Sequence, residues 1–114
     1  KNKTLNLKMI EKKIIFFSKL ELTSILNLYS KQVSKGYWKD YALDSAIDNA
    51  IFSIYKHSLD KPMYQIIKIS KKGFRNKPSF YIKKSEEVIS KSNSLFTILS
   101  NFEKKLSIKK LRNH

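Results

Sequence analysis

Three aspartates, Asp40, Asp44 and Asp48, follow one another at intervals of four residues and form the only acidic cluster of a basic chain. Three carboxylates can bind a hard cation such as Mg²⁺. Alternatively, Asp44 and Asp48 form turns by hydrogen bonding to their own backbone, and Asp40 pairs with a lysine. We favour this alternative, because the spacing matches no known metal-binding loop. We therefore expect no metal.

The remaining residues with catalytic potential are few. His57 precedes Asp60 by three positions, and His114 is the last residue. No serine and carboxylate motif and no glycine-rich loop accompany them. The chain has no cysteine, which excludes disulfides, thiolate zinc sites and cysteine nucleophiles. The sequence thus predicts a non-enzymatic domain with no catalytic residue and no cofactor.

A polyanion such as nucleic acid is the partner that the basic residues suggest. One short loop combines four cations with an aromatic residue and has no acid nearby, and the C-terminus carries three more cations. Such a surface can bind a phosphate backbone, and RNA is our first hypothesis. A solvated loop is the alternative interpretation. The candidate nucleic-acid-binding residues are Lys71, Lys72, Phe74, Arg75, Lys77, Lys109, Lys110 and Arg112.

The net charge of +15 is weaker evidence than its size suggests. The chain has 22 Lys but only 2 Arg, together with 14 Ile and 8 Asn. This composition is typical of an AT-rich genome, whereas nucleic-acid contact more often selects Arg, whose planar guanidinium binds phosphate or guanine in two places. Part of the charge is therefore explained by codon usage.

Protein interaction is the second hypothesis, in which the charge is incidental. Tyr37, Trp38 and Tyr41 lie close together in the sequence. Trp38 and Tyr41 are the candidate partner-facing residues on an exposed sheet face. The same aromatic residues also fit a buried core, which is the commoner position for them.

Length and hydropathy bound the architecture. A chain of 114 residues with 41% hydrophobic residues predicts one folded domain. We expect a basic N-terminal arm at residues 1–13, the domain at 14–107 and a basic tail at 108–114. The longest apolar run, Ile14–Phe17, is too short to cross a membrane, and no leader pattern appears. We expect a cytoplasmic location.

Ser18 and Glu21 form a capping box at the start of a predicted helix that ends at Gly36. Its apolar stripe consists of Leu22, Ile25, Leu26, Tyr29 and Val33. A second helix is predicted from an N-cap at Ser92 or Asn93, with Ile108 and Leu111 as a possible extension. Its apolar residues, Leu95, Ile98, Leu99, Phe102 and Leu106, have the same spacing as those of the first helix.

The residues between the helices predict strands, because β-branched and aromatic residues alternate with turn residues. The predicted strands are residues 38–43, 50–57, 63–70, 80–83 and 88–89, with a further short strand at 14–17. Ile47, Ile51, Ile54 and Tyr55 also fit a helical face, so a helix over 40–56 is the alternative. The predicted fold class is α+β, with an antiparallel sheet of about four to six strands packed against two amphipathic helices in the order β-α-β-β-β-β-β-α.

Four segments carry a resemblance to a known family. They are Ile25–Tyr29, Gly36–Asp44, Ala50–Lys56 and Pro62–Ile66, and the run Trp-Lys-Asp-Tyr-Ala-Leu-Asp at 38–44 is the most specific of them. Over residues 14–106 the chain resembles an uncharacterised bacterial family, domain of unknown function 2794. Where that family has a Lys-Arg-Gly-like step, this chain has Ser90-Lys91-Ser92. The resemblance implies a small cytoplasmic domain and supplies no reaction or ligand.

Overall fold

A computed structural model describes residues 14–57, 61–70 and 77–112, with side chains up to residue 108. Five strands lie between two helices in the sequence. Their bounds are α2 Lys19–Ser34, β1 Asp40–Ser45, β2 Asn49–Tyr55, β3 Tyr64–Ile69, β4 Ser79–Lys84, β5 Glu87–Ser92 and α3 Leu95–Arg112. The α+β class and the antiparallel sheet are confirmed. Residues 40–56 are two strands, so the helical alternative is wrong.

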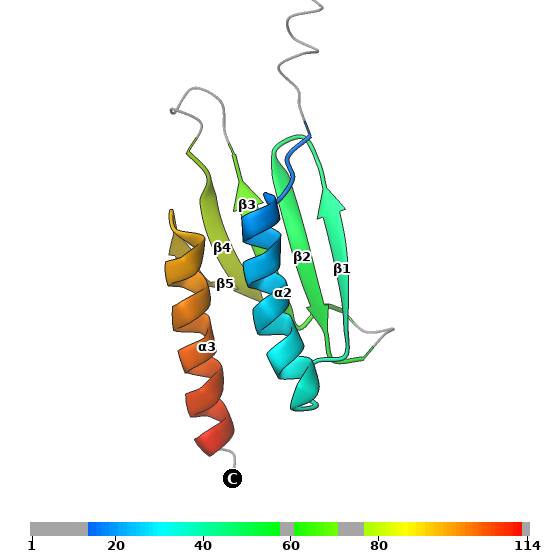
Figure 1. Ribbon diagram of the computed structural model, residues 1–114, viewed down its shortest axis with the longest axis vertical. Coiled ribbons are helices and arrows are strands. Elements are labelled where there is room, and N and C mark those ends of the chain that lie inside the picture. The colour runs from blue at the N-terminus through cyan, green and yellow to red at the C-terminus, as the bar shows by residue number, and fades with distance from the viewer. Residues whose placement is uncertain (1–13, 58–60, 71–76, 113–114) are drawn as a thin grey trace, which may run out of the picture.

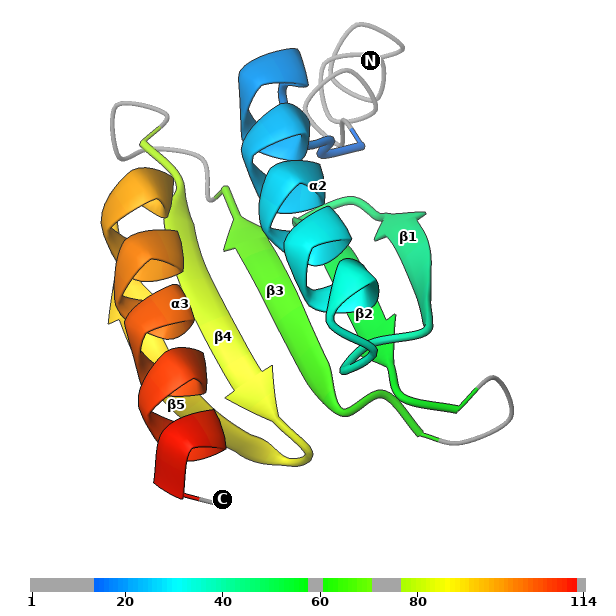
Figure 2. The ribbon, with the colours of Figure 1, turned by 60° about the horizontal axis from the view of Figure 1, so that its bottom comes forward.

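The sheet is a meander in which each strand pairs with the next along the chain, in the order β1-β2-β3-β4-β5. Every pair is antiparallel. The turn between β4 and β5 is tight, and Ser85 adopts a φ of 56° there. Both helices lie against the same face of the sheet, side by side (Figures 1 and 2). None of the described elements covers the opposite face of the sheet.

The predicted capping box begins α2. The Ser18 backbone N–H donates to Glu21 Oε1 at 2.7 Å, and the Glu21 N–H donates to Ser18 Oγ at 3.1 Å. The same carboxylate oxygen accepts from Lys68 Nζ at 2.7 Å, which ties the start of the helix to β3. At the other end, Gly36 has a φ of +80°, a conformation that glycine adopts without strain.

The buried face of α2 differs slightly from the predicted stripe. Ile25 and Leu28 are buried, Leu22, Leu26 and Tyr29 are partly buried, and Val33 is exposed. The stripe continues with Gln32 in place of Val33. A straight α-helix advances 100° per residue, so small rotations about its axis decide which of two neighbouring residues faces the sheet.

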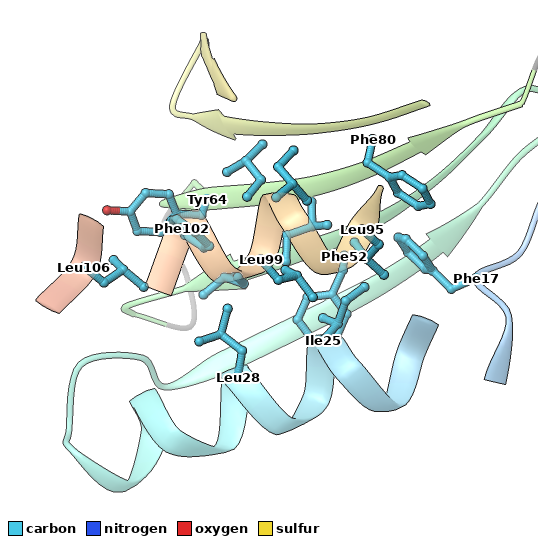
Figure 3. Close-up of a cluster of buried hydrophobic side chains, with 14 of the residues drawn as sticks. Phe17, Ile25, Leu28, Phe52, Tyr64, Phe80, Leu95, Leu99, Phe102 and Leu106 are labelled. Atoms are coloured by element: carbon cyan, nitrogen blue, oxygen red, sulfur yellow. The ribbon is translucent and has the colours of Figure 1, made fainter. Parts of the chain in front are cut away.

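The core lies between the helices and the covered face of the sheet (Figure 3). Phe52, Ile66 and Ile82 form a row across three paired strands, and none is more than 1% exposed. The helices contribute Ile25, Leu28, Leu95, Ile98, Leu99, Phe102 and Leu106 from the other side. Complete burial of a large apolar side chain contributes about 1.5–3 kcal/mol. The core therefore depends on both helices.

Three details at the ends of the elements differ from expectation. Residues 14–17 lie outside the sheet, although the Ile15 N–H donates to Ala46 O at 2.8 Å. The N-cap of α3 is Ser94, whose Oγ accepts from the Thr97 N–H at 3.3 Å. Helix α3 runs to Arg112, so residues 108–112 belong to the predicted extension of the helix through Ile108 and Leu111 and not to a separate tail.

Replacement of the N-cap residue, Ser18→Ala, should lower the free energy of unfolding by about 1 kcal/mol, because the Glu21 N–H loses its acceptor. Urea denaturation monitored by circular dichroism measures the change. Ser30→Ala, on an exposed position of the same helix, is the control. An equal effect of the two substitutions would contradict a capping role for Ser18.

Candidate functional site

The structure describes few side chains of the basic residues that the sequence singled out. Lys71, Lys72, Phe74 and Arg75 fall in residues 71–76, which the structure does not describe. Lys77 is exposed just before β4. The backbone of Lys109, Lys110 and Arg112 belongs to α3, but their side chains are not among those described. A shared surface formed by these residues stays a prediction.

Trp38 and Tyr41 do not lie on the uncovered sheet face. Trp38 is only 4% exposed and stacks on Phe102 of α3, with ring centroids 5.9 Å apart. Tyr41 is 42% exposed, but its ring stacks on buried Phe52 at 4.8 Å on the helix side. The partner-facing interpretation of Trp38 is wrong, because its ring fills the space between the sheet and α3.

A basic groove lies between the last strand and the last helix. We call it the β5–α3 groove, and its volume is about 410 Å³. The residues that line it are Ser90, Lys91, Ser92, Thr97, Ile98, Asn101, Lys104 and Lys105. Three of these are consecutive in β5, although successive side chains of a strand point to opposite faces. The groove therefore follows the edge of β5, the outermost strand of the described sheet.

The lysines of the groove take no part in the salt bridges found among the described residues. The two salt bridges of the described residues use Lys31 with Glu103 and Lys68 with Glu21. Lys105 Nζ instead donates to Ser90 Oγ at 3.5 Å, a long and weak hydrogen bond. Lys91 Nζ lies 5.5 Å from the centre of the Tyr81 ring. Lys104 and Lys105 of α3 thus place two positive charges beside polar side chains, an arrangement suited to an anion, and Lys91 lies at the rim of the groove with its ammonium over Tyr81.

The uncovered face of the sheet presents a second distinctive surface. Strand register aligns one residue from each strand in a straight line across this face. We call it the central row, and it consists of Asp44, Ile51, Ile67, Tyr81 and Lys91. The three middle residues are partly buried, and the two charged residues at its ends are exposed.

Asp40, Asp44, Asp48 and His57 are all exposed. The Asp40 carboxylate accepts from the Tyr41 N–H at 2.8 Å, and Asp44 and Asp48 are exposed. No group of three histidines or carboxylates that could bind a metal occurs among the described residues. His57 is exposed after β2, and Asp60 lies outside the described residues.

Two tyrosines of the core have altered acidity. Burial raises the pKa of Tyr29, and the nearby Asp40 and Tyr41 raise it further. Burial also raises the pKa of Tyr64, which the positive charge of Lys84 partly opposes. Both phenols are therefore protonated near neutral pH, which makes them poor general bases.

Fold and site together define a small α+β domain with a basic groove at the edge of its sheet. The family described as "Protein of unknown function (DUF2794)" matches residues 15–99, and the chain belongs to this family. No curated protein and no solved structure matches the chain. No helix within the described ranges is long and apolar enough to span a membrane.

Sequence reasoning missed the groove. Neither Lys104 nor Lys105 was among its candidate residues, and Lys91 was noted only where the chain departs from the family pattern. The alternation of Phe80, Tyr81 and Ile82 was a usable signal for an outward-facing Tyr81, since a central strand presents alternate residues to each face. No local pattern shows that β5 and α3 meet at a sheet edge.

The raised pKa of Tyr64 predicts a loss of stability in alkali. Below about pH 10 the Tyr64 phenol is protonated in both the folded and the unfolded state, so its ionisation does not change the free energy of unfolding. Above that pH the unfolded state loses its proton first, so the free energy of unfolding falls until the pH reaches the folded pKa. The stability difference between the wild type and Tyr64→Phe should therefore shift in favour of the variant above about pH 10.

Urea denaturation followed by Trp38 fluorescence from neutral to alkaline pH tests this shift. Tyr81→Phe, which removes a phenol from the uncovered face, is the control. A difference between the wild type and Tyr64→Phe that stays constant with pH would contradict the assigned burial effect.

Proposed function

We propose that this protein is a non-enzymatic binding domain for nucleic acid, with single-stranded RNA as its ligand class and the β5–α3 groove as its site. The observation that carries the proposal is a groove lined by Lys91, Lys104 and Lys105 and by no carboxylate. A phosphate backbone supplies regularly spaced negative charges, and its binding releases condensed counterions. The net charge of +15 assists the approach of such a ligand.

The polar residues of the groove suit a nucleotide backbone. Ser90, Ser92 and Thr97 offer hydroxyl groups, and Asn101 offers an amide. Such side chains donate to phosphate and sugar oxygens, and they can accept from a ribose 2′-hydroxyl. A strand of six residues extends about 20 Å, a length that accommodates a few nucleotides of a single strand. Lysine binds phosphate as a point charge, so we expect little sequence discrimination.

Charge reversal in the groove tests the proposal. The double variant Lys104→Glu and Lys105→Glu should weaken binding of a random RNA of about 12 nucleotides at least tenfold, measured by fluorescence anisotropy. The slope of log K against log salt between about 50 and 200 mM should become shallower by about 1.4, since each lost phosphate contact removes about 0.7 for a single strand.

A matched control separates location from net charge. Lys35→Glu with Lys39→Glu changes the net charge equally, at exposed positions between α2 and β1. This control should lose much less affinity than the groove variant. Equal losses would show that binding follows total charge, and absence of RNA binding at low salt would overturn the proposal. A protein that bound a polyglutamate peptide but not RNA would also overturn the proposal, and the groove would then be assigned to an acidic protein.

A further inference from the structure

The central row of the uncovered face has opposite charges at its two ends. Asp44 lies on β1, at one edge of the sheet, and Lys91 lies on β5, at the other. Ile51, Ile67 and Tyr81 lie between them on the three inner strands. Ile67, on β3, is therefore at the centre of a row that is apolar in the middle and charged at its ends.

The middle of this face is more apolar than a solvated sheet face requires. Ile69 of β3 lies beside the central row on this face. The exposed Val88 lies on the same face, on the edge strand β5. In an antiparallel sheet with one face on the core and the other in solvent, apolar and polar residues normally alternate along each strand. Here an apolar centre has a polar and charged rim, which is the usual anatomy of a protein interface.

We propose that two copies of the chain pack through this face, related by a twofold axis that runs parallel to the strands and passes near Ile67. Such an operation lays β1 of one copy over β5 of the other. Asp44 then faces Lys91 of the second copy, and Ile51 faces its Tyr81. Ile67 packs against its own counterpart, as the layers of a β-sandwich do at about 10 Å separation.

A second copy is the partner that this pattern fits, because a twofold interface must be complementary to itself. The central row satisfies that condition when it is reversed, since each end then meets the opposite charge. The neighbouring row of Ala42, Ser53, Gln65, Lys83 and Val88 also satisfies it. On reversal Ala42 meets Val88, Ser53 meets Lys83, and Gln65 meets another Gln65. No pair of like charges results.

The size of the face predicts a weak dimer. Five strands at about 4.8 Å spacing and about 20 Å length present a flat area on the order of 500 Å² per copy. Stable interfaces usually bury about 800 Å² per partner. We therefore expect dissociation in the micromolar range, which analytical ultracentrifugation can follow from about 5 to 500 µM protein without nucleic acid.

Charge exchange provides the decisive test. Asp44→Lys and Lys91→Asp should each weaken dimerisation at least tenfold, because each places two like charges opposite one another. The double variant carrying both substitutions should restore the dimer, since the pairs are re-formed with their signs exchanged. A wild type that stays monomeric throughout the concentration range, or a double variant no better than either single variant, would overturn the proposal.

A second substitution tests the centre of the face. Ile67→Lys places two lysines together at the axis and should abolish the dimer, with folding checked by circular dichroism. Leu20→Lys, at an exposed apolar position of α2, is the control and should leave the dimer intact. The groove variant Lys104→Glu with Lys105→Glu should also remain dimeric, so the outcome is independent of RNA binding. Loss of the dimer in Leu20→Lys would contradict the assigned face.

Discussion

The contact between Trp38, Tyr64 and Phe102 is the interaction on which the rest of the structure depends. Trp38 comes from the segment between α2 and β1, Tyr64 from β3 and Phe102 from α3. The centroid of the Trp38 ring lies 6.0 Å from that of Tyr64 and 5.9 Å from that of Phe102. The Tyr29 ring of α2 is 6.1 Å from the same centroid. These contacts join both helices to one face of the sheet. Aromatic pairs of this kind contribute about 0.5–1.5 kcal/mol each beyond their burial.

Both candidate surfaces follow from this one-sided packing. Phe102 packs α3 against the sheet through its contact with Trp38. Lys104 and Lys105 of α3 therefore lie beside the edge of β5 and line the groove. Because α2 and α3 share one face, the residues that alternate with the core on each strand lie on a face that no described helix covers (Figure 2). Lys91 borders both surfaces, so nucleic acid in the groove and a second copy on the sheet would lie next to each other.

Local patterns predicted the elements well. The capping box at Ser18 depends on residues three apart, and the strand residues alternate as a half-buried sheet requires. The face presented by α2 was predicted less well, since Leu28 is buried and Val33 is exposed. Trp38 was a candidate for contact with a partner, with the core as the alternative, and the structure places it in the core. Each of these errors concerns which neighbour a side chain meets, and not whether a helix or strand forms.

The sequence by itself determined the order of the helices and strands and the start of α2, and it favoured strands over residues 40–56, because these features depend on the propensities and spacing of neighbouring residues. Only the tertiary structure decided that both helices cover the same face, that lysines of β5 and α3 line one groove, and that Asp44 and Lys91 end one row. The physical reason is that strand register and helix docking join residues far apart in the chain. Their alignment depends on how the whole core packs, which no short segment encodes.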